Sequence, residues 1–523
     1  MVDSPAGFPF QGHGEKPGVD RFTLSEIPCI ADSVALESEH VWYSVTWIIR
    51  PRIAMERGSA SKLTQRTPAS SPIQLTGPSG SPTISRRSGL DAAMSNLHPD
   101  QYETGQDDTG QDDTGQDEAG PRNAHPKPQG TCFMSLTSDV RAMLPDLDGY
   151  AYFQTSGFSP KLNPVVDEVV HWLKFQSRGP ALPFVSRRIE ELKQDIRGRV
   201  AATVNATPEE IVMTENTTIG INIVANGIDW KPGDNVLLTN HEHPGNRLTW
   251  YNLTGRYDVE LRFAPMYNDL GRTLEEMDRL IDGRTRLVSV SHVSRRTGLR
   301  LPGRAVCDLA HGKDTPVLFD GAQSFGAIPI DVRALDCDFY SFCGHKYTMA
   351  PQGTGGLFIR RDRIDWLKPS WIGSHSQKTF DQEGNMDLHD EARRFEFATR
   401  SVPDQAGFGK ALDIWEGLGW EAIFAGIESY TDRMKAALLE VPGLVLETPA
   451  SYGDSSGIVT FHVPGLEAGP LSESLEQHEK VLVSPLEFAA ESTRVSTHVF
   501  NSDEDLERLT TGIRRIQREG LDA

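Results

Sequence analysis

The chain has 523 residues and is acidic, with 73 Asp and Glu against 52 Lys and Arg and a formal net charge of -21. This balance argues against nucleic acid or an anionic membrane as a partner, because both select basic surfaces. No apolar run reaches the roughly 18–20 residues that a membrane-spanning helix needs. The cysteines are scattered without CxxC spacing, so neither a disulfide framework nor a metal site is indicated: Cys29, Cys132, Cys307, Cys337 and Cys343. We expect a soluble, cytoplasmic protein.

Residues 1–135 are rich in Ser, Pro, Gly, Thr and Arg, and they include a tandem repeat over Thr104–Asp108, Thr109–Asp113 and Thr114–Glu118. Five-residue polar repeats cannot bury apolar surface, so we predict a disordered low-complexity extension. An acidic tail with a function of its own is an alternative. In another, the protein starts at Met94 or Met134 and the upstream residues are a leader.

Order is expected from about Thr137 onward. A short helix, a strand ending at Thr155 and a second helix come first. In this second helix Val166, Val169, Val170 and Leu173 form an apolar stripe at helical spacing, which predicts its buried face. A long helix is predicted over residues 184–204.

Strands and helices then alternate. Helices are predicted to open at Thr217 and after Pro244. The predicted strands are Ile211–Met213, Asn235–Thr239, Val259–Phe263, Thr285–Ser291, Val317–Asp320, Phe339–Phe342 and Gly355–Ile359. Several are continuous apolar runs, which indicates a mostly parallel sheet covered on both faces. Beyond residue 400, helices over 405–415 and 420–439, short strands and a helix over 503–518 indicate a smaller α+β domain. We predict a large α/β domain over 136–400 and a small C-terminal domain over 401–523.

The most informative block extends from Val317 to Lys346. Asp320 closes one strand, and Lys346 follows another through a short turn. Both are therefore expected at the carboxyl ends of parallel strands, where α/β folds bind ligands. A carboxylate there can keep a pyridine nitrogen protonated, and a lysine can hold an aldehyde as an imine.

Two elements in this block carry a family resemblance. The segments Asp320-Gly321-Ala322-Gln323 and Cys343-Gly344-His345-Lys346 resemble the class V aminotransferase family, which includes cysteine desulfurases, isopenicillin N epimerase, kynureninase and C–S lyases. The resemblance covers about residues 147–520. It implies the fold type I of pyridoxal 5′-phosphate (PLP) enzymes, with PLP bound as a Schiff base to Lys346.

The resemblance assigns Lys346, His243 and Asp320 to the catalytic machinery. It implies that Asp320 pairs with the pyridine nitrogen, that Gln323 bonds the phenolate oxygen and that His243 stacks on the ring. The alternatives are a helix N-cap for Asp320 and an ordinary loop histidine for His243.

The resemblance also implies a phosphate site. Thr217 and Thr218 open a helix whose N-terminus suits an anion on physical grounds alone, although they are also able to act only as helix caps. His345 and Cys343 complete the expected cofactor contacts. A thiol is a poor phosphate donor, and we expect Cys343 to be a small buried residue. Thr399 matches a position that reaches the phosphate of a neighbouring subunit, which implies a homodimer.

For the substrate, the resemblance implies a contact from Arg494, and Ser156 is expected to line the same site. The sequence departs from the family at residues 294–298, where desulfurases often carry Asn. Arg295 or Arg296 is therefore expected to contact the substrate, which would then carry an extra anionic or polar group. Arginine binds a carboxylate through a planar, bidentate fork. A structural salt bridge is the alternative for Arg494, and a solvated arginine pair is the alternative for Arg295 and Arg296.

The family's desulfurases carry a sulfur-accepting cysteine in a loop that corresponds here to Val483–Ser492, and this segment has none. We therefore expect a C–S lyase that cleaves a cysteine S-conjugate or related sulfur amino acid by α-proton abstraction and β-elimination. The alternatives are an aminotransferase, a decarboxylating or deaminating enzyme, an amino-acid epimerase, or a catalytically silent dimeric scaffold.

Overall fold

The computed structural model describes residues 131–522 apart from residue 488. Most of the predicted low-complexity extension therefore lies outside the described residues. Its last five residues, 131–135, belong to helix α1 (Thr131–Met143), and the boundary of the extension at residue 135 stays a prediction. Within the described part, no helix is both long and apolar enough to cross a membrane.

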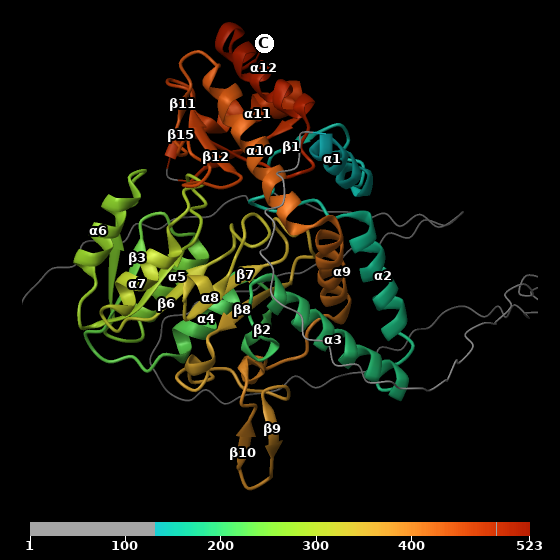
Figure 1. Ribbon diagram of the computed structural model, residues 1–523, viewed down its shortest axis with the longest axis vertical. Coiled ribbons are helices and arrows are strands. Elements are labelled where there is room, and N and C mark those ends of the chain that lie inside the picture. Colours follow the sequence, from blue (N-terminus) through green and yellow to red (C-terminus); the bar gives the residue numbers. More distant parts are fainter. Residues whose placement is uncertain (1–130, 488, 523) are drawn as a thin grey trace, which may run out of the picture. The chain divides into compact units, whose positions relative to one another are not determined.

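A seven-stranded sheet forms the centre of the larger part of the fold, in the order β2-β8-β7-β6-β5-β3-β4 (Figure 1). The strands are β2 (Ile211–Thr214), β3 (Asn235–Thr239), β4 (Glu260–Ala264), β5 (Thr285–Ser291), β6 (Val317–Asp320), β7 (Phe339–Cys343) and β8 (Gly355–Ile359). β8 runs antiparallel to both of its neighbours, β2 and β7, and the other pairs of adjacent strands are parallel. The expected α/β fold with a mostly parallel sheet is confirmed.

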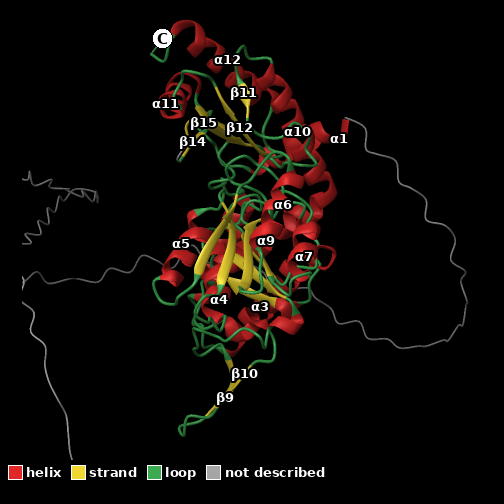
Figure 2. Ribbon diagram, turned by 90° about the vertical axis from the view of Figure 1, so that its left-hand side faces the viewer, coloured by secondary structure: helices red, strands yellow, loops and turns green. Residues whose placement is uncertain are grey.

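Alternate residues of the sheet pack into two separate hydrophobic clusters. In β6, for example, Phe319 belongs to one cluster and Leu318 to the other. Helices cover the two faces, as Figure 2 shows. They include α4 (Thr217–Gly227), α5 (Pro244–Thr254), α6 (Leu270–Leu280), α7 (Gly303–His311) and α8 (Val332–Leu335). Burial on both faces explains why these strands are continuous apolar runs.

Three further helices pack together: α2 (Asn163–Gln176), α3 (Pro183–Thr203) and α9 (Val402–Leu418). The predicted buried stripe of α2 is wrong. Its buried residues are Val165 and Trp172, whereas Val166, Val170 and Leu173 are 41–56% exposed. Apolar residues occupy two adjacent faces of this helix, and α9 packs on the one that includes Val165.

The C-terminal part contains a four-stranded antiparallel sheet in the order β11-β12-β15-β14. Its elements are α10 (Trp420–Leu439), β11 (Val445–Leu446), β12 (Ile458–His462), α11 (Ala468–Glu479), β13 (Val481–Leu482), β14 (Ser484–Leu486), β15 (Ala489–Ser496) and α12 (Asp503–Glu519). Strand β1 (Ala151–Tyr152) pairs with β13. Ala151 and Phe153 therefore belong to the core of this part, while α9 packs on α2 and α3. The division at residue 400 stays a prediction.

The remaining described elements are a hairpin and three short 3₁₀ helices. A hairpin of β9 (Gln377–Phe380) and β10 (Met386–Leu388) extends from the segment that follows β8 (Figure 1). Short 3₁₀ helices cover Pro208–Glu210, Arg361–Arg363 and Ala392–Phe395.

Candidate functional site

A cavity of about 220 Å³ lies at the carboxyl ends of β6 and β7. The structure brings all but one of the predicted site residues to its lining: Ser156, Thr217, Thr218, His243, Arg295, Asp320, Gln323, Cys343, His345, Lys346 and Arg494. The exception is Thr399. The parallel sheet produces this convergence, because consecutive strands deliver their following turns to one edge.

Lys346 follows β7 and is 8% exposed. Burial lowers the pKa of its ammonium group, and the nearby Cys343 and Asp320 partly oppose this shift. Its backbone is fixed, because the Ser159 hydroxyl and the Met349 N–H both donate to the Lys346 carbonyl. A buried lysine with a lowered pKa has more of the neutral amine that carbonyl chemistry requires.

Asp320 ends β6 and is buried. Burial raises the pKa of its carboxyl group, against the opposing effects of the Ala322 N–H and of Lys346. The Ala322 N–H donates to Oδ1 at 2.9 Å, which orients the group. This buried carboxylate makes no ion pair with any described residue. It is therefore suited to accept a hydrogen bond from a protonated, positively charged nitrogen of a ligand.

Four buried side-chain atoms that line the cavity have no hydrogen-bond partner: Ser156 Oγ, Thr217 Oγ1, Gln323 Oε1 and His345 Nδ1. Buried polar atoms are normally satisfied, so such a group around one cavity indicates a polar ligand. Gln323 is held in place by its own amide, which donates to the Ser156 carbonyl at 2.9 Å. These residues fit PLP, which presents a phenolate oxygen and a phosphate group.

The N-terminus of α4 opens into the same cavity. Asn216 caps the helix by accepting from the Ile219 N–H at 3.0 Å, and Thr217 and Thr218 are its first two residues. Unpaired N–H groups and the helix dipole favour an anion at this position. The helix approaches β7 closely at Gly220, where an added Cβ would lie 2.1 Å from Ser341 Oγ.

His243 is the N-cap of α5, and its Nδ1 accepts from the Gly245 N–H at 2.9 Å. This bond places the proton of the neutral ring on Nε2. Burial and the nearby charge of Lys346 lower the pKa of His243 to about 3. The imidazole is therefore neutral at physiological pH and suited to lie against an aromatic ring.

Arg494 lies on β15 and reaches the cavity from the C-terminal part of the fold. Its guanidinium donates to the Arg295 carbonyl at 3.1 Å and to Ser484 Oγ at 3.3 Å. It makes no ion pair with a carboxylate of the described residues, so the salt-bridge alternative has no support there. Burial lowers the pKa of Arg494 to about 10. Arg295, by contrast, pairs with Glu487 at 2.7 Å.

Cys343 lines the cavity but is buried, and burial raises the pKa of its thiol. A protonated, enclosed thiol is a poor nucleophile. Cys307 and Cys337 are buried too, and neither lines the cavity. None of Cys307, Cys337 and Cys343 is an exposed thiol that could readily accept sulfur.

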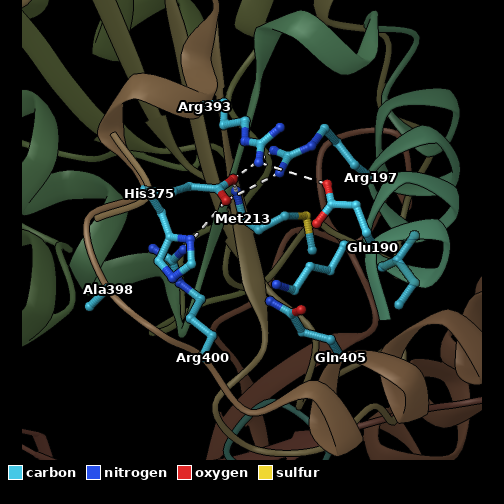
Figure 3. A pocket seen from close by; sticks show the side chains of 11 residues that line it. Glu190, Arg197, Met213, His375, Arg393, Ala398, Arg400 and Gln405 are labelled. Carbon is cyan, nitrogen blue, oxygen red and sulfur yellow. Dashed lines mark hydrogen bonds and ion pairs between the residues drawn. The ribbon is translucent and has the colours of Figure 1, made fainter. Parts of the chain in front are cut away.

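Thr399 is exposed and lies apart from the cavity that gathers the other predicted residues. Its neighbours Ala398 and Arg400 line a separate small pocket, shown in Figure 3, together with Arg197 and Arg393. The predicted phosphate contact of Thr399 is therefore not made within one chain, and its assignment to a neighbouring subunit stays a prediction.

Sequence reasoning missed four residues that line this cavity, Gly157, Phe158, Asn216 and Ala322. Two of them make contacts that shape the site. Phe158 stacks on His345 with ring centroids 5.4 Å apart, and Asn216 caps α4. The cap was detectable, because Asn immediately before a predicted helix is a strong N-cap signal. Nothing in the sequence pairs Phe158 with His345.

Comparison with known proteins identifies the family of the chain. The family described as aminotransferase class-V matches residues 151–509. A probable cysteine desulfurase of Methanothermobacter thermautotrophicus is 30% identical over 406 residues, covering 73% of this chain and 99% of its own. A cysteine desulfurase of Enterobacter sp. strain 638 is 31% identical, covering 70% of this chain and 93% of its own.

Solved structures agree. The cystine C–S lyase C-DES, in complex with its product cysteine persulfide, has a TM-score of 0.66 and 28% identity, over 70% of this chain and 98% of that one. A C-DES variant with glycine linked covalently to its PLP cofactor gives a TM-score of 0.67 at 27% identity, over 72% of this chain and 98% of that one. The expected fold type I and the PLP cofactor are confirmed. The chain is a PLP-dependent enzyme that belongs to the class V aminotransferase family.

Proposed function

We propose that this enzyme is a C–S lyase that cleaves a cysteine S-conjugate or related sulfur amino acid, with uptake of one water molecule, to a thiol, pyruvate and ammonia. The observation that carries the proposal is the composition of the cavity. It combines a buried lysine, a buried carboxyl and an arginine without a carboxylate partner, yet offers no reactive thiol. Relatives of this chain include both cysteine desulfurases and a cystine C–S lyase.

The side chains divide the work of holding cofactor and substrate. Lys346, Asp320 and Gln323 would hold the cofactor's ring, and Thr217 with the α4 N-terminus would hold its phosphate. Bound PLP supplies an electron sink that stabilises negative charge on the substrate's α-carbon. His243 is neutral, so it covers the ring without adding a charge.

The same geometry suggests how the substrate is oriented. The fork of Arg494 binds the substrate carboxylate, since its guanidinium is buried and makes no ion pair with a described carboxylate. Ser156 Oγ belongs to the same cavity and has no hydrogen-bond partner, so it is available as an additional contact for the substrate. The Lys346 amine is the base for the α-proton, and its lowered pKa keeps part of it neutral. Removal of that proton is followed by departure of the β-thiolate.

A persulfide-forming desulfurase is disfavoured, because residues 483–492 contain no cysteine and Cys343 is enclosed. Transamination and epimerisation use the same residues and are distinguished only by products. A silent scaffold is disfavoured, because it would have no reason to keep Lys346 and Asp320 buried in one cavity.

The test is mass spectrometry of the products formed from a panel of S-substituted cysteines by the PLP-loaded full chain, with Lys346→Ala as the control. Thiol and pyruvate in equal amounts, absent with Lys346→Ala, are the expected result. An intact thioether with an altered amine or α-carbon configuration would refute the lyase assignment and identify a transaminase or epimerase.

We also propose that the enzyme is a cytoplasmic homodimer. Thr399 is exposed and outside its own chain's cavity, which suits a contact with a neighbouring subunit. The exposed apolar face of α2, formed by Val166, Val170 and Leu173, offers a surface that association would bury. Three buried cysteines remain unpaired, which fits a reducing compartment.

A further inference from the structure

A second cavity lies beside the catalytic one. It measures about 530 Å³ and is formed by the first two turns of α5, the loop at Arg295 and Arg296, and the end of β14 at Glu487. The two cavities share Arg295. They also meet along the chain, because His243 lines the first and Pro244 lines the second. A group that projects beyond the catalytic cavity therefore has a place to go.

Part of this second cavity is apolar. Leu248 and Tyr251 lie on consecutive turns of α5, and they are 58% and 44% exposed although both are large apolar side chains. Leu486 adds a further apolar contact from β14. Large apolar side chains that remain accessible inside a concave site are typical of ligand-binding surfaces.

The lining is also rich in arginine. Arg247, Arg295 and Arg296 all contribute to it, and only Arg295 has an ion-pair partner among the described residues, Glu487 at 2.7 Å. The buried Nε of Arg247 has no hydrogen-bond partner, while its Nη2 donates to the Asn240 carbonyl at 2.9 Å.

The other titratable groups of the cavity do not cancel this charge. Glu242 is buried, its carboxylate accepts from Thr239 and Asn246, and burial raises its pKa. Burial and the charges of Arg296 and Arg247 lower the pKa of His241 to about 4, so this ring is neutral at physiological pH. Three arginines face two carboxyl groups, Glu242 and Glu487, so the lining keeps a positive formal charge.

We propose that this second cavity binds the sulfur substituent of the substrate, and that this substituent has an apolar body ending in an anionic group such as a carboxylate. The inference rests on the proposed lyase function and specifies its substrate class. The apolar body lies along Leu248 and Tyr251, and the anion pairs with Arg247 and Arg296. Glu487 competes with the anion for Arg295.

The test is the binding of two probe compounds, S-(4-carboxybenzyl)-L-cysteine and S-benzyl-L-cysteine, to PLP-loaded Lys346→Ala protein by titration calorimetry. This variant lacks the proposed base, so binding is measured without turnover. We expect the carboxylated probe to bind at least about tenfold more tightly, as one charge-assisted hydrogen bond provides. Adding Arg247→Gln and Arg296→Gln should remove this preference, and adding Glu487→Gln should increase it.

Arg279→Gln is the matched control, because Arg279 lies on α6, is largely exposed and does not line the cavity. It should leave the preference unchanged. Equal affinities for the two probes, or a preference that survives loss of both arginines, would overturn the inference.

The lyase function and the assignment of the second cavity can fail independently. Cleavage of S-methyl-L-cysteine by the unsubstituted enzyme tests the lyase function alone, because its sulfur substituent carries no anionic group. Selective binding of the carboxylated probe with no thiol released from any conjugate would support the cavity assignment and refute the lyase. Thiol release without binding selectivity would support the lyase function and refute the assignment of the second cavity.

Discussion

Glu396 forms a buried ion cluster with Arg197 and Arg400, close in sequence to Thr399. Figure 3 shows the two arginines in the pocket that they line. The Glu396 carboxylate accepts two hydrogen bonds from Arg197, at 2.6 and 3.1 Å, and one from the Met213 N–H at 2.9 Å. Arg400 approaches it at 3.5 Å. The side chains of Arg197 and Glu396 are only 8% and 11% exposed. Glu396→Gln keeps the size of this side chain and removes its charge.

Glu396→Gln is expected to lower the free energy of unfolding strongly, because Arg197 stays in place without its charged partner. Breaking a buried ion pair from one side costs about 3–5 kcal/mol, since an uncompensated charge remains buried. Arg197 still donates to the Ile211 carbonyl at 2.8 Å, and the new amide oxygen can accept one bond. We therefore expect Glu396→Gln to lower the free energy of unfolding by about 3 kcal/mol. The control is Glu191→Gln in the exposed pair with Arg188, where both side chains are more than half exposed and the expected loss is below about 0.5 kcal/mol.

The assay is urea unfolding of the PLP-loaded full chain, followed by tryptophan fluorescence. Burial alone would raise the pKa of Glu396, but Arg197 and Arg400 outweigh it and the net shift is downward. The contribution of this carboxylate is therefore present above its ordinary pKa of 4.5 and is lost as pH falls through the lower folded value. Equal losses for Glu396→Gln and Glu191→Gln at neutral pH would refute the reasoning.

Three further predictions concern the site, acid stability and assembly. Gly321→Ala should weaken PLP retention, measured by visible absorbance after dialysis, because the new Cβ would lie 2.2 Å from Tyr340 and displace the neighbouring Asp320. Burial lowers the pKa of His292 to about 3. As pH falls, this histidine therefore takes up a proton in the unfolded chain before it does so in the folded one. The urea midpoint should therefore fall as pH drops below 6.5, and a flat profile would contradict this. Leu173→Glu, on the exposed face of α2, should convert the proposed dimer to monomers in light scattering.

The sequence predicted most of the central sheet, because strands that are buried on both faces appear in the sequence as short continuous apolar runs. β3, β5 and β6 begin and end at the predicted residues. The face of α2 was predicted wrongly for a related reason. Val165 and Trp172 continue one apolar stripe, Val166 and Leu173 another, and local spacing does not decide which one α9 will cover.

The catalytic cavity was predictable because two strand ends carry a carboxylate and a lysine in a recognisable order. The sequence does not predict the second cavity, since its lining comes from ordinary residues of separate segments. Nothing about Leu248 or Tyr251 separates them from core positions of an amphipathic helix. Only the fold leaves them accessible beside Arg296 and Glu487.

Arg295 joins the two cavities, and this determines which substitutions are informative. Its carbonyl accepts from Arg494, its guanidinium pairs with Glu487, and its side chain lines both cavities. Replacing it would therefore disturb the position of the proposed carboxylate fork and the second cavity together. Arg247 and Arg296 line only the second cavity. A change in substrate preference on their replacement can accordingly be attributed to recognition of the sulfur substituent rather than of the amino-acid end.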